Sequence, residues 1–199
     1  MQEVIYPGDL LSETPIRAPN SYIENGKTYS MVLGFKDSSG TGIIPFEGGW
    51  TPKVEETVIG VISSERNNVY EVDLGSHYRS LIIGGKYERF SFRLGDIVEA
   101  TVKDIEDGRT IILSYPKALQ GGTVISIKPS KIPRLIGKNN TMINQISQGT
   151  SSKISVGMNG MVWIKDGNIA LATAAILRIE EEAHVSGLTG RIKEMVEKR

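Results

Sequence analysis

The residues best suited to bind a ligand lie in a short stretch between two expected helices. This stretch reads Ile136-Gly137-Lys138-Asn139-Asn140, and Lys131 and Arg134 precede it by about one helical turn. A loop of this kind presents unpaired backbone N–H groups at the start of the second helix, where the helix dipole also favours an anion. Lys138 adds a mobile positive charge at the tip. The spacing therefore predicts a site for the phosphate backbone of a nucleic acid.

A narrow apolar groove is expected beside this loop. Four aliphatic side chains from neighbouring elements would line it: Ile136, Ile143, Ile154 and Val156. Such a surface accepts unstacked bases and therefore suits single strands rather than duplexes. The structural alternative is that Gly137 only ends a short helix and that the isoleucines belong to the core.

Charge is distributed unevenly along the chain, although the 23 basic and 23 acidic residues cancel. Residues 1–107 carry 10 basic and 17 acidic residues, a net charge of −7. Residues 108–165 carry eight basic residues and no acid, and residues 166–199 carry five basic and six acidic residues. The central block has the charge expected of a nucleic-acid surface, so the overall neutrality does not exclude RNA.

Several chemistries are excluded or disfavoured by residue type. The chain has no cysteine, which removes disulfides, thiolate nucleophiles and Cys-built zinc sites. The two histidines, His77 and His184, are too far apart in sequence to form a helical pair of metal ligands. We expect no cofactor. The chain begins without a basic and apolar leader and contains no apolar run long enough to span a membrane, so an intracellular protein is expected.

An enzyme remains the alternative from a different class. Four carboxylates cluster in sequence and could hold a magnesium ion: Asp96, Asp104, Glu106 and Asp107. Their positions also fit a turn that leads into a strand, a hairpin with alternating faces and an Asp-Gly turn. No Ser/His/Asp triad or P-loop spacing accompanies them. We therefore expect no catalytic residue and no metal site.

The predicted fold is multidomain, mostly β with an α/β part. Residues 1–52 indicate a small β domain, and residues 57–115 a closed β-barrel that ends before Pro116. The barrel strands are expected at Thr57–Ile62, Val69–Leu74, Ile97–Asp104 and Thr110–Ser114, with a tight turn at Asp107-Gly108. Residues 119–186 have the order β-α-α-β-β-α, and residues 187–199 form a carboxy-terminal helical tail.

The elements of the βααββα segment follow from local patterns. Strands are expected at Thr123–Lys128, Lys153–Val156 and Met161–Ile164, and short helices at Lys131–Ile136 and Thr141–Ser147. Asn168 can cap a long last helix, because the residues that follow repeat at helical spacing. The apolar face of that helix comprises Ile169, Ala172, Ile176 and Ile179.

Alternation along one barrel strand predicts which side chains face outward. Tyr70, Val72 and Leu74 share the core face, which leaves Val69, Glu71 and Asp73 on the opposite face. Acids on that face argue against strong RNA binding across the whole barrel. The better contact candidates are His77, Tyr78 and Arg79 in a loop, with Lys103 and Arg109 near the last hairpin. A solvated polar loop is the alternative for each of them.

Two segments resemble known RNA-binding modules. The loop that spans Ile136–Ile143 resembles the GXXG loop of a type I KH domain, which clamps about four nucleotides, with Asn140 in place of the second glycine. Residues 57–114 resemble an S1-type RNA-binding barrel, an OB-fold variant, through Val58-Ile59-Gly60-Val61, Leu94-Gly95-Asp96-Ile97-Val98 and the closing strand.

Two further motifs resemble those of one family, the RNA-binding cap subunits of the exosome of the Rrp-four type. The first is the opening Val4-Ile5-Tyr6-Pro7-Gly8-Asp9-Leu10-Leu11, and the second is the turn Gly157-Met158-Asn159-Gly160 followed by Trp163. Glycines on both sides of Met158-Asn159 permit an unusual chain reversal, and Trp163 is expected to pin the turn to the core. This second motif is interpreted as structural.

The resemblance implies a non-catalytic role in RNA degradation and processing. Three copies would cap a hexameric ring of phosphorolytic ribonuclease-type subunits, with the amino-terminal domain docking on the ring through Pro7, Gly8 and Asp9. The cap would capture single-stranded RNA, including adenine-rich 3′ tails, and feed it to the 3′-to-5′ exoribonuclease. The compact length resembles archaeal members and implies a cytoplasmic protein. The alternative is a free-standing transcription or translation factor with S1-type and KH domains.

Overall fold

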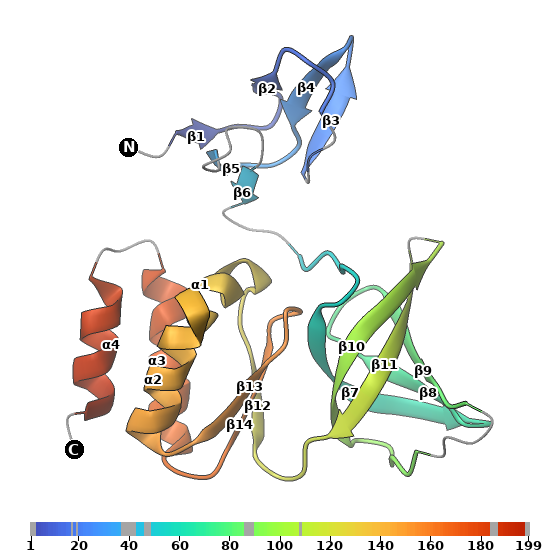
Figure 1. The fold of residues 1–199 in the computed structure, drawn as a ribbon, viewed down its shortest axis with the longest axis vertical. Coiled ribbons are helices and arrows are strands. Elements are labelled where there is room, and N and C mark those ends of the chain that lie inside the picture. The colour runs from blue at the N-terminus through green and yellow to red at the C-terminus, as the bar shows by residue number, and fades with distance from the viewer. Residues whose placement is uncertain are drawn as a thin grey trace. The chain divides into compact units, whose positions relative to one another are not determined.

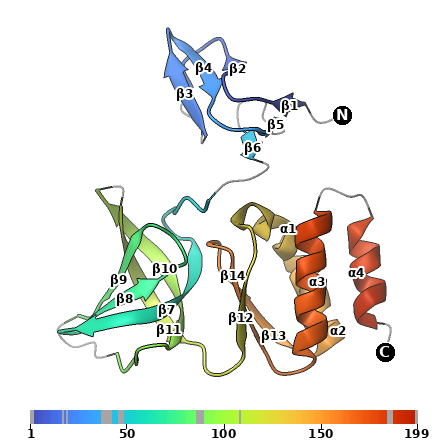
Figure 2. The same cartoon turned by 180° about the vertical axis from the view of Figure 1, so that it is seen from behind.

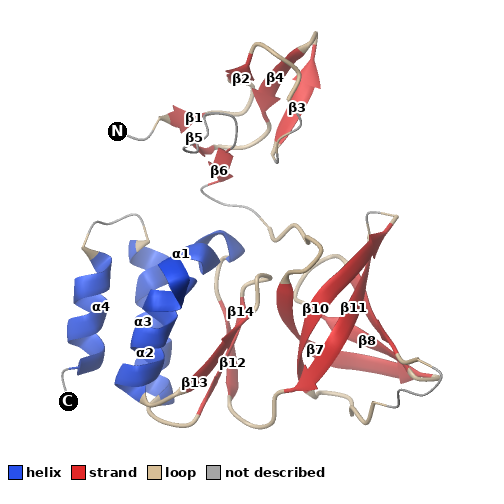
Figure 3. Cartoon of the chain, in the orientation of Figure 1, coloured by secondary structure: helices blue, strands red, loops and turns tan. Residues whose placement is uncertain are grey.

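The computed structural model describes residues 3–16, 18, 20–36, 43–45, 49–85, 90–107, 109–183 and 187–197. The chain divides into two compact units, residues 1–49 and 50–199. All helices that the structure describes belong to the second unit and follow residue 128 (Figure 3). The mostly β fold with a separate α/β part is confirmed.

The first unit is built from short strands in two sheets (Figure 1). One sheet has the order β1-β5-β6 and the other β2-β4-β3. The strand bounds are β1 Val4–Ile5, β2 Leu10–Ser12, β3 Ser21–Glu24, β4 Lys27–Ser30, β5 Gly34–Lys36 and β6 Ile43–Pro45. Its small core comprises Ile5, Leu11 and Ile43, with Val32 packed against them. Several large apolar side chains among the described residues of this unit are exposed.

The second unit begins with a closed five-stranded barrel in the order β10-β11-β9-β8-β7. Its strands are β7 Thr57–Arg66, β8 Val69–Asp73, β9 Arg79–Ile83, β10 Ile97–Glu106 and β11 Thr110–Ala118. β11 pairs with β9 in parallel, and the other neighbours pair antiparallel. The predicted core face of β8 is confirmed, because Tyr70, Val72 and Leu74 are each 2% exposed.

Two expectations for the barrel are wrong. Arg79 opens strand β9 and does not lie in a loop. The sequence pattern hides β9 because Ser80, a polar residue, occupies an inward position at 1% exposure. The barrel does not end before Pro116 either, since β11 continues to Ala118 through a bulge at Tyr115, where φ is 50°. A bulge tolerates proline because it interrupts the ladder of hydrogen bonds. In the predicted Asp107-Gly108 turn, Gly108 lies outside the described residues.

The predicted β-α-α-β-β-α order is confirmed after the barrel. The elements are β12 Thr123–Ser126, α1 Ile132–Ile136, α2 Thr141–Thr150, β13 Lys153–Val156, β14 Met161–Lys165 and α3 Ile169–Glu182. Short 3₁₀ turns at Pro129–Lys131 and Lys138–Asn140 precede α1 and α2. Asn168 caps α3 as predicted, because its side chain accepts a hydrogen bond of 3.0 Å from the backbone N–H of Leu171.

The three strands form an antiparallel sheet in the order β12-β14-β13. The helices cover one face of this sheet, and the barrel lies beside the other face (Figures 1 and 2). The terminal helix α4, Leu188–Glu197, packs against α2 and α3. Leu188, Ile192 and Val196 join the same buried cluster as Ile176 of α3. The helical tail expected from the sequence is therefore part of the α/β segment and contributes buried side chains to its core.

Candidate nucleic-acid interface

The loop between α1 and α2 has a backbone that few residue types adopt. Gly137 has φ 72° and ψ 171°, and Asn139 and Asn140 have φ values of 52° and 60°. A Cβ atom on Gly137 would lie 2.9 Å from the backbone nitrogen of Met142, so a side chain has no room there. Asparagine is among the non-glycine residues that most readily enter the left-handed region. Asn140 therefore preserves the turn in which a second glycine would be expected.

The loop presents its polar groups to solvent. Lys138, Asn139 and Asn140 are exposed. The Thr141 hydroxyl donates to the backbone oxygen of Lys138 at 2.8 Å, which holds the loop against the start of α2. The Asn140 side chain makes no capping hydrogen bond to α2. The loop is therefore held by a hydrogen bond within the chain, and its exposed polar groups are accessible to a ligand.

The four groove residues come together from three elements. Ile136 of α1, Ile143 of α2, and Ile154 and Val156 of β13 pack against one buried cluster. Each is only partly buried, whereas Ile132 and Ile146 of the same helices are fully buried at 0% exposure. They form the rim of the core rather than its centre. The partly buried positions of these side chains fit the apolar groove that the sequence predicts, and the groove itself stays a prediction.

Positive charge surrounds the loop. Arg134 and Lys138 are exposed and Lys131 is half-buried. None of the three forms a salt bridge with any residue that the structure describes. Their charges therefore remain available to an anion from outside the chain.

The barrel candidates are more constrained. Arg79 donates from Nε to Oε1 of Glu71 at 2.9 Å, and Ser64 donates to the other carboxylate oxygen at 3.2 Å. The hydrogen bond from Arg79 is the largest cause, and together with the bond from Ser64 it holds the pKa of Glu71 below its usual value. One predicted basic contact is thereby neutralised by the acid on the adjacent strand. Weak RNA binding by this outward face of β8 stays a prediction from the sequence.

The aromatic candidates of the barrel also have partners. The rings of His77 and Tyr78 lie in tilted contact with centroids 4.1 Å apart, and Tyr78 meets Trp50 edge-to-face at 6.2 Å. Tyr78 is thus part of the packing around the barrel core. Lys103 and Arg109 are exposed. Sequence reasoning missed Tyr115, which is 87% exposed beside a groove that Lys103 also lines, because a positive φ at the bulge turns it outward.

The Gly157–Gly160 turn joins the α/β segment to the barrel. Asn159 is 7% exposed, and its Nδ2 donates to the backbone oxygens of Ile59 at 2.7 Å and Leu74 at 2.9 Å. Its Oδ1 accepts from the N–H of Ile59 at 3.1 Å. A Cβ on Gly157 would lie 2.7 Å from the same Ile59 nitrogen. The motif therefore has a structural role, because it packs closely against the barrel and bonds the α/β segment to it.

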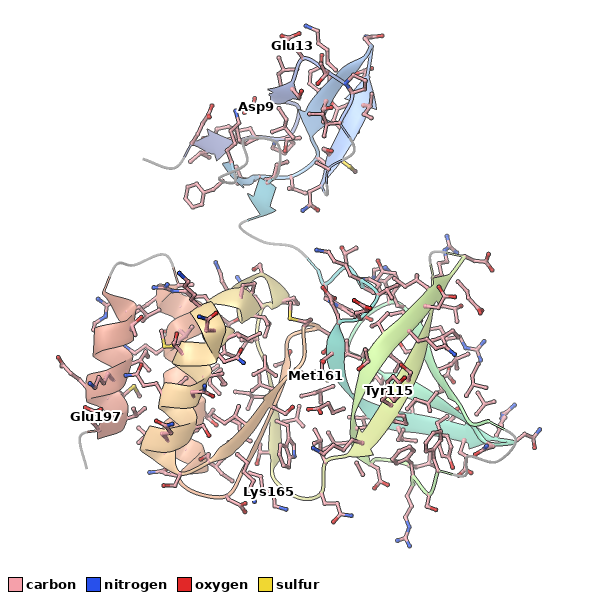
Figure 4. The ribbon with its side chains drawn as sticks, in the orientation of Figure 1. Asp9, Glu13, Tyr115, Met161, Lys165 and Glu197 are labelled. Atoms are coloured by element: carbon pink, nitrogen blue, oxygen red, sulfur yellow. The ribbon has the colours of Figure 1, made fainter. Side chains whose placement is uncertain are left out.

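Trp163 packs at this junction. It forms a buried cluster with Ile59 of β7 and Leu119, and its indole N–H donates to the backbone oxygen of Gly121 at 2.7 Å. Met161 packs against the same cluster, on the side of β14 that faces the barrel (Figure 4). The tryptophan thus packs with the barrel residue that Asn159 binds.

The Pro7-Gly8-Asp9 turn lies on the surface of the first unit between β1 and β2. Asp9 accepts a hydrogen bond of 2.8 Å from the N–H of Tyr6, and Gly8 has φ 90° and donates to Ser30 at 2.8 Å. Large apolar side chains near this turn are exposed, and sequence reasoning did not single them out as contacts: Val4, Tyr6, Leu10, Met31 and Leu33. A rigid turn flanked by exposed apolar groups is typical of a protein-binding surface.

The described His, Asp and Glu side chains form no group of three that could hold a metal ion. No described helix combines the length and apolar character needed to cross a bilayer.

Family models match two parts of the chain. Residues 2–47 match the N-terminal domain of the exosome RNA-binding protein RRP4, and residues 122–170 match a KH domain. A crystal structure described as that of an exosome complex RNA-binding protein is 28% identical, with a TM-score of 0.67. The match covers 76% of this chain and 97% of that one.

Curated relatives match along almost the whole chain. Exosome complex component Rrp4 of Pyrococcus furiosus is 38% identical, over 98% of this chain and 83% of the relative. The protein of the same name from Thermococcus kodakarensis is 36% identical, over 98% and 85%. That from Methanosarcina barkeri is 31% identical, over 96% and 80%. The chain belongs to the Rrp4 family of exosome complex components.

Proposed function

We propose that this protein is a non-catalytic, RNA-binding subunit of the archaeal exosome. Three copies cap the hexameric ring of phosphorolytic ribonuclease-type subunits, capture RNA and feed it to the 3′-to-5′ exoribonuclease. The observation that carries this proposal is the match to Rrp4 relatives over 98% of the chain. The exposed, unpaired basic loop above the apolar rim supports it independently, because it can hold a single strand.

In this proposal, three regions of the chain share ring docking and RNA binding. Residues 1–52 dock on the ring, residues 57–118 form the S1-type domain and residues 119–186 form the KH domain, against which the terminal helix α4, Leu188–Glu197, packs. The Pro7-Gly8-Asp9 turn and the exposed apolar groups beside it supply the docking surface. Location in the cytoplasm and binding of adenine-rich 3′ tails are further parts of this proposal.

The KH loop supplies more RNA affinity than the outer face of the barrel. Lys138 and Arg134 have no described salt bridge, whereas Arg79 is held by Glu71. A cation already paired with a carboxylate contributes less to the release of counterions from the RNA. His77, Lys103 and Arg109 then make secondary contacts near the ends of the barrel strands.

Reconstitution with the ring subunits of the same organism tests the proposal. We expect the protein to co-elute with the ring and to speed degradation of a single-stranded RNA, while the protein alone shows no nuclease activity with magnesium or phosphate. A protein that binds RNA but stays monomeric beside the ring would instead be a free-standing factor. Nuclease turnover by the isolated chain would contradict the accessory role.

A further inference from the structure

A cleft of about 430 Å³ lies where the barrel meets the sheet of the KH domain. Lys117 lines it from the barrel strand β11, and Lys153 and Lys165 line it from β13 and β14. Figure 4 labels Lys165 at the lower end of β14, opposite to the Met161 end. The residues that line the cleft include none of the Lys138 loop and none of the Gly157–Gly160 turn, and of the predicted groove residues only Ile154 lines it.

Two cross-strand pairs place these charges close together. Lys153 is directly opposite Lys165 on neighbouring strands of the KH sheet. Glu99 is directly opposite Lys117 in the barrel. Ser155 connects the two sheets, because its hydroxyl donates to the Glu99 carboxylate. The junction therefore holds its charged side chains on ordered strands rather than on loops.

The charges of the cleft do not balance within the chain. Among its described lining residues, three are lysines and only Glu99 is an acid. Lys117 forms no salt bridge with any described residue, and Lys165 donates to the backbone oxygen of Gln120 at 2.8 Å. Lys153 pairs with Asp166 at 3.0 Å in an exposed position, where such pairs contribute little. Like charges directly opposite each other on a sheet are destabilising, so a bound anion would relieve their repulsion.

We propose that this cleft binds a backbone phosphate of single-stranded RNA next to the segment that the KH groove holds. Ile154 connects the two places, since it lines the cleft and also packs at the apolar rim of the groove. The inference rests on the proposed function, because the KH loop would hold the neighbouring nucleotides. RNA is favoured over an acidic protein because the three lining lysines belong to the acid-free block of residues 108–165, which also carries the loop.

Fluorescence anisotropy of the full chain with a labelled single-stranded RNA of about 12 nucleotides tests the cleft, since this length exceeds the roughly four that a KH loop clamps. The test variant combines Lys117→Gln, Lys153→Gln and Lys165→Gln. We expect affinity to fall about tenfold and the salt slope to fall by about 0.7 for each phosphate that the variant no longer neutralises. The matched Arg variant at the same three positions should retain binding, because it keeps the charge. Lys193→Gln on the exposed face of α4 should change nothing.

The outcomes separate this inference from the proposed function. An unchanged slope in the triple Gln variant, with binding still sensitive to Lys138→Gln, would overturn the cleft and leave the KH loop in place. Loss of ring association with intact RNA binding would assign the cleft to a protein partner and also overturn the inference. Absence of RNA binding by the unaltered protein would defeat the proposed function itself. Thermal unfolding confirms that the variants are folded, and the Arg variant excludes a purely structural effect.

Discussion

Asn159 binds both backbone polar groups of Ile59 with one side-chain amide. Its Oδ1 accepts from the Ile59 N–H at 3.1 Å and its Nδ2 donates to the Ile59 oxygen at 2.7 Å. Ile59 is 0% exposed, so these groups have no access to water. An amide is suited to this position because it offers a donor and an acceptor at the spacing of a backbone peptide. The Asn159 side chain thereby joins the KH domain to the barrel with the pair of hydrogen bonds that a neighbouring β-strand would make.

Replacing this amide should uncouple the two domains. Asn159→Ala leaves the backbone groups of Ile59 and Leu74 unpaired in a buried place, so we expect a loss of about 2–3 kcal/mol in the free energy of unfolding. Urea denaturation followed by far-UV circular dichroism measures the change. Asn144→Ala, at an exposed position of α2, is the control and should change stability by less than about 0.5 kcal/mol. Equal effects of the two substitutions would contradict the structural role of the motif.

Two helix glycines should respond in opposite directions to alanine. A Cβ on Gly149 of α2 would lie 2.7 Å from the Cβ of Val196 on α4, whereas one on Gly190 would meet nothing within 4 Å. We expect Gly149→Ala to destabilise the fold by about 1–3 kcal/mol through overpacking. Gly190→Ala should stabilise it by about 0.5 kcal/mol through helix propensity. Thermal denaturation compares them, and a neutral Gly149→Ala would mean that α4 does not pack tightly on α2.

Removal of the loop charges should weaken RNA binding and reduce its salt dependence. The double change of Lys138 and Arg134 to Ala deletes two unpaired cations beside the groove. The slope of log affinity against log salt should fall by about 0.7 for each phosphate left without its cation. Anisotropy titrations of single-stranded RNA at several salt concentrations measure the slope. A slope equal to that of the unaltered protein would remove the KH loop from the binding site.

The Glu71–Arg79 pair should have a measurable titration signature. Arg79 holds the pKa of Glu71 below its ordinary value of 4.5. Because the folded-state pKa is lowered, the stabilisation is present above the unfolded pKa and is lost as the pH falls through the folded one. In Arg79→Ala the pKa of Glu71 should rise, as followed by carboxyl chemical shifts during an acid titration. An unchanged Glu71 titration would show that the two side chains do not pair in solution.

Local pattern is sufficient to predict much of the KH domain. The β-α-α-β-β-α order, the Asn168 cap and the inward face of β8 in the barrel depend on neighbours within a few residues, and each is confirmed. Strand β9 escapes prediction because Ser80 breaks its apolar alternation, although it is only 1% exposed. The prediction that the barrel ends before Pro116 is wrong, because a bulge at Tyr115 accommodates the proline and β11 continues to Ala118.

The sequence by itself determined the family, the order of the modules and the positive charge of residues 108–165, because these are properties of residue type and spacing along the chain. Only the tertiary structure decided which groups meet. Asn159 finds partners 100 and 85 residues away in Ile59 and Leu74, and Lys117 reaches the cleft of Lys153 and Lys165 across the domain junction. Such contacts depend on how the barrel closes and how the sheet packs against it, which no local spacing encodes.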